Sequence, residues 1–311
     1  MSARRLVGVD IGGTSVKLGA VDLEGNVLGE ANVPIEADLR ERRAGPGSLP
    51  ANALLDAIVE RARKLAPDEE LERLGVGIPG LFDRATGTIA FSPNLPWFAG
   101  VSVTSELATR LGVEVDAVTL ENDANVAALG EAWLGGGKGS QHVLVVTLGT
   151  GVGGGLILNG ELFIGEGGAG EIGHVIVDPT RPASQSGLTG SVENLASATA
   201  AMRRAREAGL VDDLAELARR ARKGAGPERE LFETIGYDLG LGLAAPLMLL
   251  DVQTFVFGGG FAGALDVLEP GIRRGMKERD FGTRDDAVRI LPATLGSRAG
   301  WLGAAKLSDR R

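Results

Sequence analysis

The hydrophobic and polar positions of the first eighty residues predict a set of strands followed by one helix and one strand. Short apolar runs end at glycine or polar turns, which is typical of strands joined by hairpins, and a later segment carries apolar residues at helical spacing. The predicted strands are Leu6–Asp10, Val16–Asp22, Val27–Glu30 and Leu74–Ile78, and the predicted helix is Ala51–Leu65. The chain therefore opens as an antiparallel meander followed by a helix and a strand.

The rest of the chain alternates helical and strand patterns and repeats the opening unit. Strands are predicted at Ala117–Leu120, His142–Leu148, Gly155–Leu158, Thr254–Phe257 and Val288–Leu291, and helices at Ser102–Leu111, Ala124–Trp133, Val192–Ala208, Leu210–Arg222, Glu228–Leu250, Ala264–Arg279 and Ala299–Leu307. This order predicts an α/β fold with two similar halves. We expect a smaller domain over residues 1–119 and a larger one over residues 120–298, with the helix at about 299–311 packing back on the first.

Composition narrows the classes of function. The 311 residues include 32 Lys and Arg against 41 Asp and Glu, and the resulting net charge of −9 disfavours nucleic acid and anionic membranes as partners. The absence of cysteine excludes disulfides, cysteine nucleophiles and thiolate metal sites. No secretory signal and no apolar run long enough to span a membrane is visible. We therefore expect a cytoplasmic protein.

Glycine clusters in three turns that could hold phosphate groups. In the first turn, Asp10 ends a strand and is followed by Gly12, Gly13 and Thr14, with Lys17 within reach. Because glycine has no side chain, backbone N–H groups of this turn can approach an anion. The alternative is an ordinary hairpin with a solvated Asp. The second, Gly149–Gly155, contains Thr150 and Gly151 and precedes a predicted strand, which favours a phosphate hairpin over a dinucleotide turn. The third turn contains Gly258, Gly259 and Gly260 and lies between a strand and a helix. This third turn matches the dinucleotide-binding fingerprint. Dinucleotide-binding folds usually open with that unit, whereas this chain opens with antiparallel strands, so NAD binding is disfavoured.

Two further segments carry candidate catalytic or binding side chains. Glu121, Asn122 and Asp123 stand where a strand ends and a helix begins, the place where α/β folds bind ligands. Asp123 could be only a helix cap, or it could accept a hydroxyl proton. Glu171 and His174 share a glycine-rich loop, where a lone histidine is more often structural than a ligand.

Taken together, these segments resemble the ROK family of bacterial sugar kinases, which belongs to the actin-like superfamily of hexokinases and heat-shock ATPases. The matching segments are DIGGT at 10–14, GIPG at 77–80, PNLPW at 93–97, ENDANVAALGE at 121–131, LGTGVGGG at 148–155, GEIGH at 170–174 and GGG at 258–260. Each motif is weak alone, but their order along nearly the whole chain is specific.

The resemblance implies two ribonuclease-H-like domains with an active-site cleft between them, and ATP and Mg²⁺ as cofactors. It implies that Asp123 is the general base and that Asp10 places Mg²⁺, directly or through water. The residues implied for sugar binding are Gly80, Asn94, Asn122, Asp123, Glu171, His174 and Glu193. Those implied for nucleotide binding are Asp10, Gly12, Gly13, Thr14, Lys17, Thr150, Gly151, Gly258, Gly259 and Gly260.

One departure from the family pattern is large. The family usually binds zinc through three cysteines and the histidine of the GEIGH segment, whereas serines stand near the cysteine positions here. Because hydroxyls are poor zinc ligands, no zinc is expected. We expect hydrogen bonds among Ser184, Ser186, Ser191 and His174 to support the sugar loop instead.

The resemblance implies a small-molecule kinase that works as a homodimer. Its implied reaction is ATP-dependent phosphorylation of a hexose at a primary hydroxyl, with glucose as the first choice of acceptor. The alternatives within the enzyme class are kinases for N-acetylmannosamine, N-acetylglucosamine or fructose, and a polyphosphate-dependent glucokinase. Outside it, a sugar-sensing repressor of the same family is disfavoured because no basic helix precedes Asp10. A third alternative is a non-catalytic ATP-binding protein.

Overall fold

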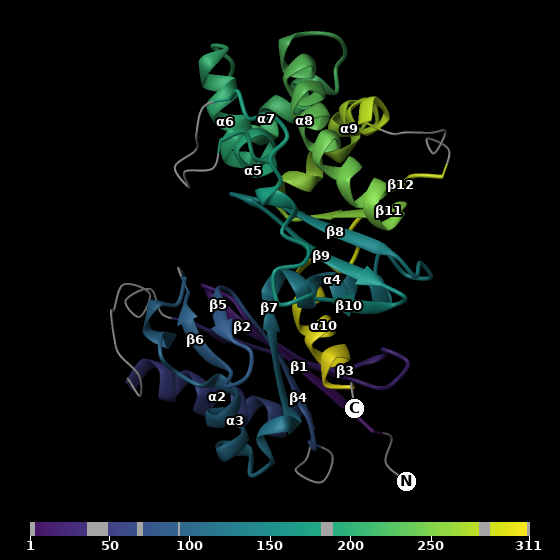
Figure 1. Ribbon diagram of the computed structural model, residues 1–311. Coiled ribbons are helices and arrows are strands. Elements are labelled where there is room, and N and C mark those ends of the chain that lie inside the picture. The colour runs from purple at the N-terminus through teal and green to yellow at the C-terminus, as the bar shows by residue number, and fades with distance from the viewer. Residues whose placement is uncertain are drawn as a thin grey trace. The chain divides into compact units, whose positions relative to one another are not determined.

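The computed structural model of the chain describes residues 4–35, 49–66, 71–92, 94–181, 189–279 and 287–309. The chain divides into two compact units, one of Met1–Gly135 with Ser297–Arg311 and the other of Gly136–Gly296. Each unit contains a five-stranded sheet with helices packed on it (Figure 1). The α/β fold predicted from the sequence is confirmed. Within the described residues, no helix is long and apolar enough to cross a membrane.

The first unit is built on a sheet with the strand order β3-β2-β1-β4-β7. Strands β1, β2 and β3 pair antiparallel, whereas β4 and β7 run parallel to β1. The strands are β1 (Leu6–Ile11), β2 (Ser15–Val21), β3 (Val27–Pro34), β4 (Leu74–Ile78) and β7 (Val118–Asn122), and a separate hairpin consists of β5 (Leu81–Asp83) and β6 (Thr88–Phe91). The helices are α2 (Leu49–Leu65), α3 (Val103–Leu111), α4 (Asp123–Leu134) and α10 (Ala299–Ser308).

The two faces of this sheet differ in character, because successive side chains of a strand point to opposite faces. Val7 and Val9 of β1 are fully buried in an apolar core shared with α2 and α3. Gly8 lies on the opposite face, where a Cβ atom would overlap the backbone of Trp301 in α10. Gly75 of the neighbouring strand β4 is equally close to α10. Glycine therefore allows α10 to lie directly on the backbone of the sheet.

Helices α4 and α10 pack closely, and this contact decides where the first unit ends. A Cβ atom at Gly130 of α4 would overlap the carbonyl oxygen of Ala299, and one at Gly303 of α10 would overlap the carbonyl oxygen of Val126. Both helices therefore belong to the first unit, which continues as far as Gly135. The boundary lies further along the chain than the division predicted at residue 120, because helical periodicity alone does not show which sheet α4 covers.

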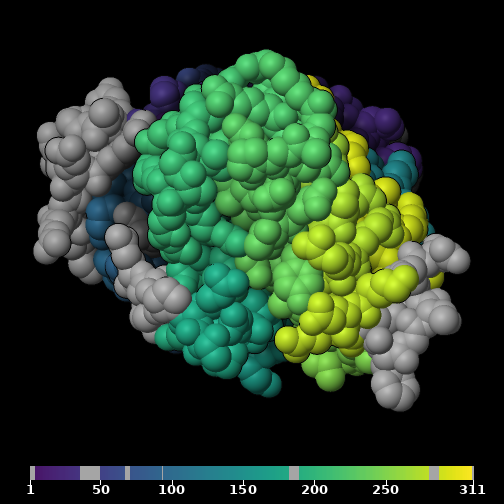
Figure 2. Space-filling view, turned by 90° about the horizontal axis from the view of Figure 1, so that it is seen from above, coloured from purple at the N-terminus to yellow at the C-terminus, as the bar shows by residue number. Residues whose placement is uncertain are grey.

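The second unit repeats the topology of the first, as the two similar halves of the sequence indicated. Its sheet has the order β10-β9-β8-β11-β12, with β8, β9 and β10 antiparallel and β11 and β12 parallel to β8. The strands are β8 (Val143–Leu148), β9 (Val152–Leu158), β10 (Glu161–Phe163), β11 (Thr254–Gly258) and β12 (Arg289–Pro292). The helices are α5 (Val192–Ala196), α6 (Ala198–Glu207), α7 (Leu214–Ala221), α8 (Pro227–Leu250) and α9 (Leu265–Arg279). Seen from above, α6 to α9 form the green and yellow-green surface of this unit (Figure 2).

The sequence predicted one helix over Val192–Ala208, and the structure corrects this to two helices separated at Ser197. Ser197 has an extended backbone, and its hydroxyl accepts a hydrogen bond from the N–H of Ala200. Serine at this position caps the start of α6, and a capping residue cannot continue the preceding helix. The consequence is a separate, short helix α5, which carries Glu193.

Candidate functional site

Two carboxylates gather at the carboxyl ends of the parallel strands in the first unit. Asp10 is the penultimate residue of β1, and Asp123 follows β7 as the first residue of α4. Burial and the negative charge of Asp123 raise the pKa of Asp10 to about 6, while Lys17, its cross-strand partner, lowers it. Burial also raises the pKa of Asp123, against hydrogen bonds from its own N–H and that of Ala124. Paired, half-buried acids with raised pKa values are typical of a functional site.

Asp10 also lies against the start of α10. Asp10 and Gly8 share one face of β1, and a Cβ atom at Gly300 would overlap the carboxylate of Asp10. The positive end of the helix dipole lies at this terminus and favours a negative charge there. The sheet and α10 together therefore fix where this carboxylate points.

The turn between β1 and β2 is closed by a backbone hydrogen bond and lies against Asn94. The N–H of Gly12 donates to the carbonyl oxygen of Ser15 at 3.0 Å and closes the turn. A Cβ atom at Gly13 would lie 3.1 Å from the Cβ atom of Asn94, so this predicted sugar ligand stands beside the predicted phosphate turn. Thr14 precedes β2, and its carbonyl oxygen accepts from the N–H of Ile35.

Asn122 is the residue that caps α4. Its Oδ1 atom accepts from the N–H of Ala124 at 2.9 Å, and its Nδ2 atom donates to the carbonyl oxygen of Gly80 at 3.5 Å. The sequence left open whether Asp123 is only a helix cap. In the structure Asn122 occupies the cap position, and the Oδ1 atom of Asp123 also accepts a hydrogen bond from the N–H of Ala124. The structure thus brings Gly80, Asn122 and Asp123 together.

A buried ion pair behind these residues was missed by the sequence analysis. Glu121 is 3% exposed and accepts two hydrogen bonds from the Arg84 guanidinium, at 2.6 and 2.8 Å. Burial alone would raise the pKa of Glu121, but bonds from Arg84, Asn125 and the N–H of Asn122 hold it below the usual 4.5. The only sequence signal is a charged residue at the end of an apolar strand, which does not identify the partner. Arg84 lies between β5 and β6, so the pair ties that hairpin to the start of α4.

The second unit places Glu193 against its glycine turn. Glu193 Oε2 accepts from the N–H of Val152 at 3.1 Å, and a Cβ atom at Gly151 would overlap the same carboxylate. The carbonyl oxygen of Thr150 accepts from the Thr199 hydroxyl at 2.7 Å. The structure therefore joins a predicted sugar ligand to the predicted phosphate turn at residues 149–152.

The other predicted site residues of the second unit surround the same turn. Gly259 has a φ of +87°. A Cβ atom at this residue would overlap the carbonyl oxygen of Leu148, which immediately precedes the turn. The segment of Gly258, Gly259 and Gly260 therefore lies beside the turn. Gly173 lies equally close to the backbone of Val152, so the GEIGH segment packs on β9. Within that segment, His174 Nε2 lies 3.7 Å from Glu171 Oε2, and both side chains are more than half exposed.

The donor groups of the chain fit magnesium better than zinc. Magnesium is commonly held by one or two carboxylates together with substrate phosphates, and Asp10 and Asp123 supply such oxygen donors. A thiolate zinc site does not fit a chain without cysteine. Over the described part of the chain, no group of three or more His, Asp and Glu side chains could hold a metal ion. Ser184 and Ser186 lie outside the described residues, and Ser191 caps α5 by accepting from the N–H of Asn194.

Comparisons with known proteins agree with this geometry. The sequence pattern of the ROK family matches residues 6–311. A glucokinase from Thermotoga maritima is 33% identical over 100% of this chain and 99% of its own. The crystal structure of a ROK hexokinase from Thermus thermophilus is similar with a TM-score of 0.80 at 34% identity, covering 97% of this chain and 96% of that one. A ROK family glucokinase from Streptomyces griseus, solved with glucose and AMPPNP, gives a TM-score of 0.70 at 31% identity over 97% of this chain and 98% of its own.

Proposed function

The chain belongs to the ROK family and is a sugar kinase, and from this premise we propose that it transfers the γ-phosphoryl group of ATP to the 6-hydroxyl group of glucose. The observation that carries the proposal is the half-buried Asp123 carboxylate, whose charge raises the pKa of Asp10 at the carboxyl ends of the parallel strands of the first sheet. The similarity to glucokinases, one of them solved with glucose and an ATP analogue, supports glucose and ATP as the substrates.

In the proposed reaction, Asp123 accepts the proton of the 6-hydroxyl group as that oxygen attacks the γ-phosphorus. The bond from the γ-phosphorus to the β–γ bridging oxygen breaks, and ADP leaves. Because burial raises the pKa of Asp123, its carboxylate binds this proton more strongly than a solvated aspartate would. Asn94, Asn122, Glu171, His174 and Glu193 are proposed to orient the sugar by hydrogen bonds to its other hydroxyl groups.

Phosphoryl transfer depends mainly on alignment and on neutralisation of charge. We assign the backbone N–H groups of Gly13 and Gly151 to the phosphate oxygens, with Gly12, Thr14, Thr150 and Lys17 beside them. Asp10 would hold Mg²⁺, which when bound neutralises charge on the phosphates. The segment of Gly258, Gly259 and Gly260 is proposed to lie by the adenosine.

Substitution of Asp123 tests the proposed base. Asp123→Asn keeps the shape of the side chain but removes its ability to accept a proton, so kcat should fall by about 10²–10⁴-fold while the KM for glucose stays nearly unchanged. ADP release in the presence of glucose measures both constants. Asp116→Asn, at an exposed site before β7, is the matched control and should retain full activity. Near-normal turnover by Asp123→Asn would remove Asp123 from this role.

The identity of the substrates is tested by a panel of acceptors and donors. Glucose, fructose, mannose, N-acetylmannosamine and N-acetylglucosamine are compared by kcat/KM, each with ATP and with polyphosphate as donor. We expect the highest value for glucose with ATP. A higher value for an N-acetylated sugar or for polyphosphate would reassign that substrate and leave sugar phosphorylation itself intact.

A further inference from the structure

Helix α5 is too short to be stable by itself. It contains five residues, so most of its carbonyl groups lack a partner within the helix, and an isolated helix of this length does not form in water. Its apolar side chains are buried, among them Val192 and Leu195. Its polar groups must therefore find partners on neighbouring elements.

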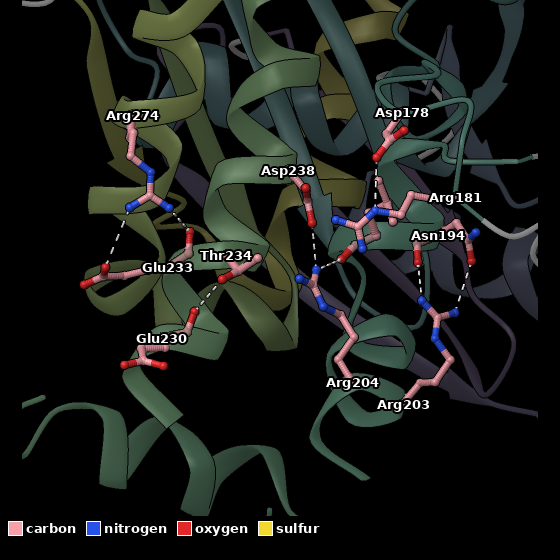
Figure 3. A network of polar contacts seen from close by, with 11 residues as sticks. Asp178, Arg181, Asn194, Arg203, Arg204, Glu230, Glu233, Thr234, Asp238 and Arg274 are labelled. Atoms are coloured by element: carbon pink, nitrogen blue, oxygen red, sulfur yellow. Dashed lines mark hydrogen bonds and ion pairs between the residues drawn. The ribbon is translucent and has the colours of Figure 1, made fainter. Parts of the chain in front are cut away.

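Two consecutive arginines of α6 supply those partners (Figure 3). Arg203 donates to the backbone carbonyl of Asn194 at 2.8 Å and to its side-chain oxygen at 3.2 Å. Arg204 donates to the carbonyl oxygen of Leu195 at 3.1 Å. Cationic donors at the carboxyl end of a helix form hydrogen bonds to its last carbonyl groups and interact favourably with the negative end of its dipole.

Arg204 is itself fixed by a buried acid of α8. Its Nη1 atom lies 2.7 Å from Asp238 Oδ2, and the two side chains are only 15% and 5% exposed. The neighbouring Arg206 forms a similar pair with Asp212, but its side chain is 61% exposed and its partner's 57%. Exposed pairs contribute little, whereas a buried pair fixes the geometry of both side chains. Arg204 therefore joins α5, α6 and α8 at one point.

Helix α5 and the start of α6 hold the glycine turn at residues 149–152 in place. Glu193 of α5 binds the N–H of Val152. At the start of α6, the N–H of Ala198 donates to the carbonyl oxygen of Gly149 at 2.9 Å, and the Thr199 hydroxyl to that of Thr150. A displacement of α5 would therefore move the Glu193 carboxylate and the turn together.

We propose that Arg204, held by Asp238, is a positioning residue that fixes Glu193 and, through it, the 149–152 turn. The proposal rests on the proposed function, in which Glu193 binds a sugar hydroxyl and the turn binds phosphate. In this chain, which has no cysteine, the arginine and its buried acid support the helix that carries the sugar ligand.

The first test compares two arginines of the same helix. Arg204→Gln removes the charged donor to Leu195, and we expect the KM for glucose to rise by about 10-fold, as is typical when a supporting partner of a ligand is lost. Arg206→Gln removes an exposed ion pair and should leave both KM and kcat unchanged. A wild-type KM for Arg204→Gln would overturn the proposal.

A second variant separates positioning from stability. In the double variant Arg204→Met with Asp238→Leu, two apolar side chains replace the buried ion pair, an exchange that often preserves or increases stability. The donor to Leu195 remains absent, so we expect a melting temperature near that of the wild type together with the raised glucose KM. A double variant with both values at the wild-type level would show that Arg204 has only a structural role.

Amide hydrogen exchange gives a readout that does not depend on activity. In Arg204→Gln, peptides covering residues 192–196 and 149–152 should lose protection, while those of β8 and β11 should not. Unchanged protection at both segments would refute the anchoring. If the wild-type protein showed no sugar-dependent ADP release, the proposed function would fail, and this measurement would still decide whether Arg204 holds α5 and the turn.

Discussion

Half-buried Asp10 and buried Glu121 have pKa values shifted in opposite directions, although both stand at the same level of the first sheet, in register with Gly77 of β4. The pKa of Asp10 is raised because burial and the charge of Asp123 outweigh Lys17. The pKa of Glu121 is lowered despite its burial because a guanidinium and two further donors bind it. Ionised Asp10 therefore costs stability at neutral pH, whereas ionised Glu121 contributes stability. This contrast separates an acid that is proposed to bind a cation from an acid that holds structure.

The first residue-scale prediction concerns Asp10. Its folded-state pKa exceeds the usual 3.8, so the folded state holds the proton more tightly, and stability is lost as pH rises from about 4 to about 6. Asp10→Asn removes this loss and should increase the free energy of unfolding at pH 7.5 by about 3 kcal/mol, while abolishing kinase activity. Denaturant unfolding in EDTA at pH 4 and pH 7.5 measures the effect. An equal change in the free energy of unfolding at both values of pH would contradict the pKa assigned to Asp10.

The second residue-scale prediction concerns the pair of Arg84 and Glu121. Arg84→Met leaves a buried carboxylate without its main partner and should lower the free energy of unfolding at neutral pH by about 2–3 kcal/mol. Since the folded-state pKa of Glu121 is lowered, the loss should shrink on acidification below the usual 4.5. Arg298→Met, which breaks the more exposed pair with Glu30, is the matched control and should change stability by less than about 1 kcal/mol. A pH-independent loss in Arg84→Met would argue against the ion pair as its cause.

At the scale of elements, helices α4 and α10 approach the sheet of the first unit at glycines, which have no side chain. Gly8 and Gly75 leave the backbone of β1 and β4 open to α10, and Gly77 admits Val126 of α4. Asp10 stands on this same face of β1, so the close approach of α10 also brings the helix terminus to the carboxylate. The packing of the element and the geometry of the acid therefore have a common origin.

The element-scale prediction tests this close approach. Gly75→Ala introduces a Cβ atom into the backbone of Ala304 and should lower the free energy of unfolding by about 3 kcal/mol through overpacking. Gly263→Ala, at an exposed position with open space around its Cα atom, should change it by less than about 0.5 kcal/mol. Thermal and denaturant unfolding measure both. A neutral Gly75→Ala would mean that α10 moves away at little cost.

The sequence predicted the elements better than it predicted their partners. Most strands of the two large sheets and the glycine turns could be located because apolar runs and glycine clusters are local signals, and β4 was predicted with its observed bounds. The short strands β5, β6 and β10 were not predicted. The break at Ser197 was missed because a capping serine resembles any other polar residue within a helical pattern. The pairs of Arg84 with Glu121 and Arg204 with Asp238 could not be predicted, because each joins residues far apart along the chain and neither partner specifies the other.

At the scale of the whole molecule, one unit is continuous in sequence and the other is not. Residues 136–296 form the second unit without interruption, whereas the first is completed by residues 297–311. Trp301 and Leu302 of α10 are almost fully buried there, against β1, β2 and β4. The fold of the first unit therefore depends on the last helix of the chain.

The prediction at this scale is the effect of deleting residues 297–311. The deletion uncovers the glycine face of β1 and β4, so amides of these strands should exchange rapidly with solvent, while those of β8 and β11 in the second unit keep their protection. Hydrogen exchange followed by mass spectrometry measures both sets. Wild-type protection of β1 in the shortened protein would show that α10 is dispensable for the first unit.

The same arrangement has a consequence for biosynthesis. Along the chain, the whole second unit lies between β1 and α10, so a ribosome makes the strand that bears Asp10 long before the helix that covers it. The second unit is complete on the nascent polypeptide before that helix exists. We therefore expect the sheet of the first unit to mature after the second unit has been made, which gives chaperones a long period of access to the uncovered strands.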